Sequence, residues 1–165
     1  MGVESKCELL DFELDDFEVP CSEIKERLNK SLISGVTVLD VYENGRKIRD
    51  LSYLICVISL EFDNGIPAGA EEQIRALFDR ENLMVPKKTK SGIQQQDIIP
   101  MIRKFHLRQA GEKTLEIEAT ICCQNPTLNP MQIPLAINVH CPDIKFDFSH
   151  CSRLEVLDKD EKIFR

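Results

Sequence analysis

Two His-Cys pairs in the last third of the chain contain side chains that could bind a metal ion. They are His140-Cys141 and His150-Cys151. Imidazole nitrogen and thiolate sulfur are ligands that zinc prefers in proteins. Adjacent residues of a strand point to opposite faces, so only one member of each pair could readily reach a shared ion. The spacing also differs from the standard zinc patterns, and the sequence therefore leaves metal binding open, with these four residues as the candidate ligands.

The other groups with reactive side chains do not form a familiar catalytic or cofactor motif. An iron–sulfur cluster needs closely spaced cysteines, whereas Cys122 and Cys123 are adjacent and Cys141 is remote. Neither a serine nor a cysteine lies in a nucleophile-elbow or triad context. Gly65 and Gly69 lack the spacing of a phosphate-binding loop. We therefore assign no catalytic residue and expect no cofactor.

Residues 86–109 form the markedly basic part of the sequence and could provide a surface for a protein partner or for RNA. Its cations are Lys87, Lys88, Lys90, Arg103, Lys104 and Arg108. Clustered Lys and Arg supply most of the affinity for a polyanion. RNA recognition usually adds exposed aromatic rings, but Phe105 shares a strand face with Leu107 and is expected in the core. The alternative is an ordinary solvated hairpin, with Arg103, Lys104 and Arg108 forming opposite-charge pairs with the neighbouring strand that carries Glu116 and Glu118.

Composition and charge predict an acidic globular protein of the cytoplasm. The chain has 165 residues, of which 42% are hydrophobic, and a formal net charge of −7. This composition suits one ordinary domain with a packed interior, and the acidity disfavours nonspecific phosphate binding. Seven cysteines without an apolar signal sequence favour reduced thiols and a reducing compartment. The longest apolar run, Leu54–Leu60, is far too short to span a bilayer, and we expect no membrane association.

The first quarter of the chain predicts a strand, a helix and a second strand. Leu10, Phe12 and Leu14 alternate with acidic residues, which is typical of a half-buried strand at residues 8–15. Apolar residues recur every four positions and predict a helix over residues 22–33. The β-branched run at residues 36–42 predicts the second strand, and Asn44-Gly45 marks the turn that follows it.

The rest of the chain alternates strands with two further helices. The patterns predict a central strand covered on both faces (52–62), a helix (69–81), four strands (83–89, 94–98, 103–108 and 114–121), a helix after Asn129-Pro130, and one bent strand or two within 144–157. Ser91-Gly92 is the expected hairpin tip. Pro134 requires the last helix to begin late or to be short, because an interior proline removes a backbone hydrogen bond. The predicted fold is α+β, with a mostly antiparallel sheet and about three helices. We expect a single domain of residues 1–165, with two ferredoxin-like βαβ halves near 1–62 and 63–165 as the finer alternative.

A series of short motifs follows in order along the chain. They are Gly2-Val3-Glu4-Ser5, Glu8-Leu9-Leu10-Asp11, Glu26-Arg27-Leu28-Asn29, Lys87 to Gly92, Asp97 to Ile102, Asn129-Pro130 and Arg153-Leu154-Glu155. Their order and spacing resemble those of the radical-SAM-linked protein family, a bacterial domain of unknown function, over essentially the whole chain. The resemblance implies an accessory of a radical-SAM enzyme, with no catalytic residues to carry over. It also implies a further portion ahead of Gly2, which this chain lacks.

These observations favour a noncatalytic accessory module that docks onto a radical-SAM enzyme or presents its substrate. The alternative is an RNA-contacting module in RNA modification that uses the basic hairpin at 87–108. A small enzyme is a third reading, for which the sequence offers no residue. If a preceding portion normally supplies a neighbouring strand, the first strand here exposes an edge through which homo-oligomers could form.

Overall fold

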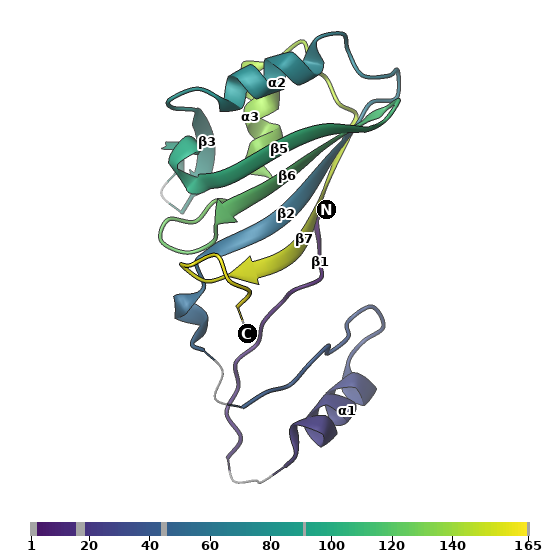
Figure 1. Ribbon diagram of the computed structural model, residues 1–165, viewed down its shortest axis with the longest axis vertical. Helices are drawn as coiled ribbons and strands as arrows, with labels where there is room; N and C mark the ends of the chain where they lie inside the picture. Colours follow the sequence, from purple (N-terminus) through teal and green to yellow (C-terminus); the bar gives the residue numbers. More distant parts are fainter. Residues whose placement is uncertain (1–2, 16–18, 44–45, 91, 165) are drawn as a thin grey trace. The chain divides into compact units, whose positions relative to one another are not determined.

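A five-stranded sheet occupies most of the computed structural model, which describes residues 3–15, 19–43, 46–90 and 92–164. Figure 1 shows the strands in the order β1-β7-β2-β6-β5. They are β1 (Val3–Ser5), β2 (Tyr53–Glu61), β5 (Ile102–Gly111), β6 (Thr114–Cys122) and β7 (Phe148–Leu157). The short β1 is parallel to β7, and the other neighbours are antiparallel. The predicted α+β class with a mostly antiparallel sheet is confirmed.

The two helices α2 (Ala70–Phe78) and α3 (Gln132–His140) cover one face of this sheet (Figure 1). In β2 the side chains of Leu54, Cys56, Ile58 and Leu60 are buried, and those between them are half-buried. Successive strand residues point to opposite faces, so β2 has one helix-covered face and one face that we call the open face. The position of β2 in the middle of the sheet is as predicted, but its expected burial on both faces is wrong.

The connections of the sheet follow the ferredoxin-like pattern. The units β2-α2-β5 and β6-α3-β7 are two strand-helix-strand halves, and the sheet order of their strands is β7-β2-β6-β5. In each half the two strands are separated, and a strand of the other half lies between them. Two βαβ halves are therefore present, but their elements interleave within one sheet.

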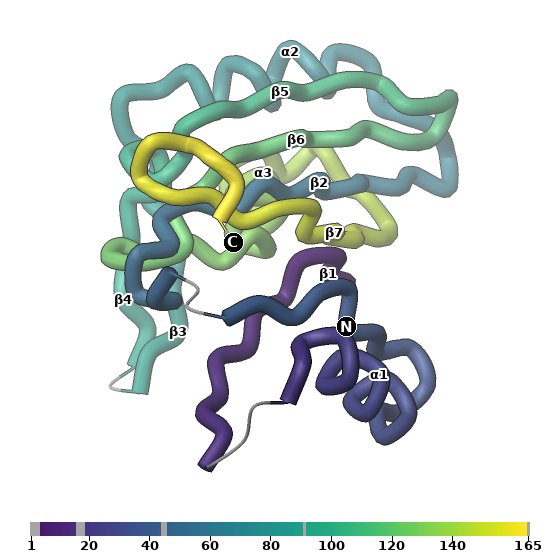
Figure 2. The backbone as a smooth tube through the Cα atoms, turned by 60° about the horizontal axis from the view of Figure 1, so that its bottom comes forward, coloured from purple at the N-terminus to yellow at the C-terminus, as the bar shows by residue number. Residues whose placement is uncertain are grey.

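A hairpin is inserted between α2 and β5. It consists of β3 (Met84–Thr89) and β4 (Gly92–Asp97), which form a separate two-stranded sheet. Figure 2 shows it projecting from the five-stranded sheet. This hairpin is as predicted, although Ser91 of its expected tip lies outside the described residues. The 3-10 turn η2 (Ile99–Met101) then leads into β5.

The start of α3 explains how its proline is accommodated. The helix begins at Gln132, so Pro134 lies in the first turn. Backbone N–H groups of a first turn have no partner within the helix, and a proline there removes no hydrogen bond. The side-chain oxygen Oδ1 of Asn129 accepts a hydrogen bond from the Met131 backbone N–H at 3.0 Å. The late start expected from Pro134 is confirmed.

Residues Leu9–Ile48 form a second unit, which we call the α1 unit, and Met1–Glu8 with Arg49–Phe164 form the sheet unit. The α1 unit contains α1 (Cys21–Ser31), close to the predicted helix, and the 3-10 turn η1 (Ile48–Asp50) begins at its end. The strands predicted at 8–15 and 36–42 are not formed, because neither segment pairs with another strand. The turn predicted at Asn44-Gly45 lies outside the described residues.

The boundary between the units differs from the predicted division near residue 62. A cut there would separate β2 from β6 and β7, its two hydrogen-bonded neighbours. Among the described residues, no helix has the length and apolar character needed to cross a membrane.

Candidate functional site

The cations of β5 are engaged in ion pairs. Arg108 lies directly opposite Glu116 on β6 and forms an ion pair with it, as the sequence pattern predicted. Lys104 instead pairs with Glu161, in the turn after β7, and the Arg103 Nε lies 3.8 Å from the same carboxylate. The hydrogen bond from Lys104 and the nearby charges of Lys104 and Arg103 lower the pKa of Glu161 below its ordinary value of 4.5. These three cations therefore already have anionic partners.

The three hairpin lysines are in a different situation. Lys87 and Lys88 lie on β3, and Lys90 follows it. The Lys87 Nζ donates to the Thr127 carbonyl at 3.5 Å, whereas Lys88 and Lys90 are exposed. Within the described ranges, no carboxylate lies at ion-pair distance from any of the three. The six predicted surface cations thus lie in two separate sheets, and only those of the hairpin lack a described anionic partner.

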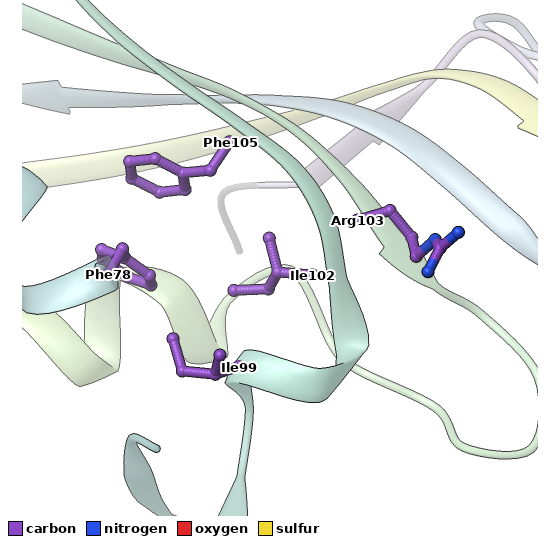
Figure 3. Close-up of a pocket in the computed structure, with 5 residues that line it drawn as sticks. All are labelled: Phe78, Ile99, Ile102, Arg103 and Phe105. Atoms are coloured by element: carbon purple, nitrogen blue, oxygen red, sulfur yellow. The ribbon is translucent and has the colours of Figure 1, made fainter. Parts of the chain in front are cut away.

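A small hollow lies between α2 and the start of β5. It has a volume of about 120 Å³ and is lined by Phe78, Ile99, Ile102, Arg103 and Phe105. The rings of Phe78 and Phe105 are stacked, with centroids 4.4 Å apart and planes 19° from parallel. Figure 3 shows the Arg103 side chain directed away from the four apolar residues. Its guanidinium instead lies 5.6 Å from the centroid of the Tyr53 ring. The hollow can accept about one apolar side chain and offers no converging acid, base or nucleophile.

The candidate metal ligands are not brought together. The His140 Nε2 is 2.8 Å from the Met84 carbonyl oxygen, and Cys141, which follows it at the end of α3, is buried. His150 lies on β7 with its Nε2 3.7 Å from a Glu4 carboxylate oxygen. In the described part of the chain, no group of three or more His, Cys, Asp or Glu residues could hold an ion. The zinc hypothesis therefore gains no support from the geometry.

The pKa is raised above its ordinary value in five of the seven thiols, with burial contributing in each: Cys7, Cys56, Cys122, Cys123 and Cys141. Cys56 and Cys151 are fully buried on neighbouring strands. The hydrogen bond between them, together with burial, raises the pKa of Cys56, and the same hydrogen bond lowers the pKa of Cys151. Burial also raises the pKa of Cys123 to about 11. The thiolate is the nucleophile, so a raised pKa leaves little reactive form near neutral pH.

The α1 unit is the feature whose exposure the sequence did not predict. No described residue between 9 and 48 is buried. Of the fourteen large apolar side chains that are exposed in the described chain, eight belong to this unit: Leu10, Phe12, Leu14, Leu32, Ile33, Val36, Leu39 and Tyr42. The alternating pattern correctly marked Leu10, Phe12 and Leu14 as an apolar row, but it predicted that the row would be covered. We call these eight residues the α1-unit surface.

Comparison with known protein families assigns the chain to one of them. Residues 1–130 match a family described as an uncharacterised protein conserved in bacteria, DUF2344. The chain belongs to the DUF2344 family. The match covers the α1 unit and the sheet unit as far as the loop before α3. The α1-unit surface and the hairpin lysines of this DUF2344 chain therefore both lie within it. Neither a search of curated proteins nor a search of solved structures found a match.

Proposed function

We propose that this DUF2344 chain is a noncatalytic accessory module that docks onto a radical-SAM enzyme. The α1-unit surface carries the proposal. Eight large apolar side chains exposed within one unit favour an interaction site, because isolated soluble proteins rarely leave much large apolar surface in water. The class of partner comes from the resemblance of the chain's ordered motifs to radical-SAM-linked proteins.

The size of the α1-unit surface indicates how much of it a partner would have to cover. Fully burying one large apolar side chain contributes about 1.5–3 kcal/mol, so eight half-exposed ones contribute about 6–12 kcal/mol. Association costs about 4–15 kcal/mol in lost translational and rotational freedom. The two ranges overlap, so a contact with one or two of these residues is too weak. The partner must cover most of the unit.

Co-purification of the full chain with a radical-SAM enzyme of the same organism tests the docking. Ile33→Ser in the α1 unit has a matched control in Ile93→Ser on β4, since their side chains are 76% and 75% exposed. We expect Ile33→Ser to weaken binding about 5–30-fold, which corresponds to about 1–2 kcal/mol of lost burial. Ile93→Ser should change it less than about twofold. Equal effects, or no complex with the wild-type chain, would refute the proposal.

The hairpin lysines favour one second candidate, an RNA-contacting module in RNA modification. Lys87, Lys88 and Lys90 offer positive charge that no described carboxylate neutralises. The cations of β5 argue in the other direction for the sheet, because Arg103, Lys104 and Arg108 already pair with Glu161 and Glu116. RNA binding would therefore involve the projecting hairpin.

A salt-dependent gel shift with tRNA or rRNA fragments tests this candidate. Changing Lys87, Lys88 and Lys90 together to Glu should abolish the shift. The same change at Lys6, Lys145 and Lys159, which are exposed outside the hairpin, alters the net charge equally and should only weaken it. Binding that responds alike to both triple variants would exclude the hairpin.

A further inference from the structure

The sheet unit shows what one ferredoxin-like half requires from the other half of the fold. In β2-α2-β5, the gap between β2 and β5 is filled by β6 of the other half. In β6-α3-β7, the gap between β6 and β7 is filled by β2. Each half thus offers a vacant strand position that only an inserted antiparallel strand can complete, and burial of its apolar side chains depends on that insertion.

The α1 unit has the same sequence pattern without the second half. An alternating segment at 9–15 is followed by α1 and then by the β-branched segment 36–42. The Asn29 side chain joins the helix to the second segment, since its Nδ2 donates to the Val38 carbonyl at 3.1 Å and its Oδ1 accepts from the Val38 N–H at 2.7 Å. The unit is therefore held as a helix with an attached extended segment.

Backbone groups in both segments are available for pairing. In an extended chain, neighbouring residues direct their N–H and C=O groups to opposite edges. With Val38 bonded to Asn29, the groups of Thr37 and Leu39 point to the other edge, and no ladder includes them. Residues 9–15 make no hydrogen bond with any other described residue. Unpaired strand edges are sites where an extended peptide adds to a protein.

We propose that the α1 unit is an open half of a ferredoxin-like fold that is completed by a strand from the partner, inserted against residues 9–15 and 36–42. This inference deepens the docking function proposed above and rests on it. The inserted strand alternates apolar residues, which cover Leu10, Phe12 and Leu14, with Lys or Arg. The partner in this mode is a basic amphipathic strand of the radical-SAM enzyme.

Charge complementarity favours the basic amphipathic strand over a second copy of this chain as the inserted strand. Asp11, Glu13 and Asp15 alternate with the apolar row, and the segment 9–15 contains no cation. Residues 9–48 contain nine acidic and five basic residues. Pairing two copies through this segment would place carboxylates opposite carboxylates, which destabilises a sheet, whereas opposite charges on paired strands stabilise it.

Two synthetic nonapeptides test the inserted strand on the full chain. One alternates Lys with Val, and the matched control alternates Glu with Val. Backbone amide NMR shifts are recorded at millimolar peptide. We expect the Lys peptide to shift amides of residues 9–15 and 36–42 and to bind at least about 10-fold more tightly than the Glu peptide. Absent shifts, shifts elsewhere, or equal binding of the two peptides would overturn the inference.

A variant with reversed charges in residues 9–15 provides a second test of the inserted strand. Changing Asp11, Glu13 and Asp15 together to Lys alters only exposed side chains, so the fold should persist and the preference should invert towards the Glu peptide. An unchanged preference would show that the peptide does not pair with this segment. Sedimentation of the wild-type chain should show a monomer, and a dimer in which hydrogen exchange of residues 9–15 is slowed would favour a second copy instead.

The two proposals can fail separately. If the radical-SAM enzyme co-purifies but hydrogen exchange in the complex protects only the sheet unit, docking stands and strand insertion falls. If the Lys peptide pairs with the α1 unit but the enzyme does not bind, the open half stands and its assigned partner is wrong.

Discussion

Glu161 neutralises two cations of the basic segment that the sequence singled out as a candidate partner surface. It lies in the turn after β7 with a positive φ of 59° and pairs with both Lys104 and Arg103. The sequence indicated that Arg103, Lys104 and Arg108 could pair with acidic residues of the following strand, and the pair of Arg108 with Glu116 is of that kind. It gave no indication of Glu161, which is 57 residues from Lys104 in the chain. Half of the predicted partner surface is therefore a set of internal ion pairs.

The Glu161→Gln variant should be less stable than the wild-type chain at neutral pH. Because the folded protein lowers the pKa of Glu161, its carboxylate stabilises the fold above the unfolded pKa of about 4.5. That contribution is lost as the pH falls through the lower, folded pKa. The difference in Tm between the two proteins should therefore be largest at pH 6–7 and shrink towards pH 3. Glu112→Gln in another exposed turn is the control, and a pH-independent difference would contradict the assignment.

Cys123 should be alkylated slowly in the folded protein. With its pKa raised to about 11 from an ordinary 9.0, the thiolate fraction at pH 8 is about 100-fold smaller. Iodoacetamide labelling followed by peptide mass spectrometry measures the rate, with the same residue in denaturant as the reference. Rapid native labelling of Cys123 would show that it is activated and would reopen a catalytic reading.

At the scale of elements, the sequence predicted most of those whose partners lie within the chain. The strands β2 and β6 have strong apolar patterns, and the apolar side chains of each are buried. The segments 8–15 and 36–42 have patterns of the same kind but form no strand. An apolar pattern shows which side chains can be buried. Whether the segment forms a strand also depends on a neighbouring strand with which it can pair. The two predicted strands that did not form both belong to the α1 unit, whereas β1, which pairs with β7 in the sheet unit, was not predicted.

Gly69, which precedes α2, should resist substitution for a backbone reason. Its φ is +73°, in the left-handed region that side chains disfavour, although a new Cβ would have only the Gln73 Nε2 at 3.8 Å. We expect Gly69→Ala to lower the free energy of unfolding by about 1–2 kcal/mol. Gly111→Ala is the matched control, since nothing lies within 4 Å of its added Cβ. Urea unfolding of both variants measures the difference, and equal stabilities would contradict the strain.

At the scale of the whole molecule, stability should be unequally distributed between the two units. The α1 unit has no buried residue among those described, while β2 and β6 are paired on both sides and largely buried on one face. Amides that lack both burial and a hydrogen-bonded partner open without global unfolding. The fold class followed from the order of elements, but this division did not, because composition and periodicity are similar in both units.

Hydrogen exchange of the free chain measures that inequality. Amides of residues 9–15 and of Thr37 and Leu39 should exchange at close to the unprotected rate, and those of β2 and β6 should exchange at least about 1000-fold more slowly. Mass spectrometry of peptic fragments resolves the two groups. Comparable protection in both groups would mean that the α1 unit already has its covering surface within the chain.

The interleaving of the two halves also constrains how the protein is made. β2 is synthesised early, but one of its neighbours in the sheet is β7, about 90 residues later. While the ribosome is still translating α3, that side of β2 has no strand to pair with. The nascent sheet therefore stays open on this side until the last strand has left the exit tunnel, and during that interval a chaperone has an edge to hold.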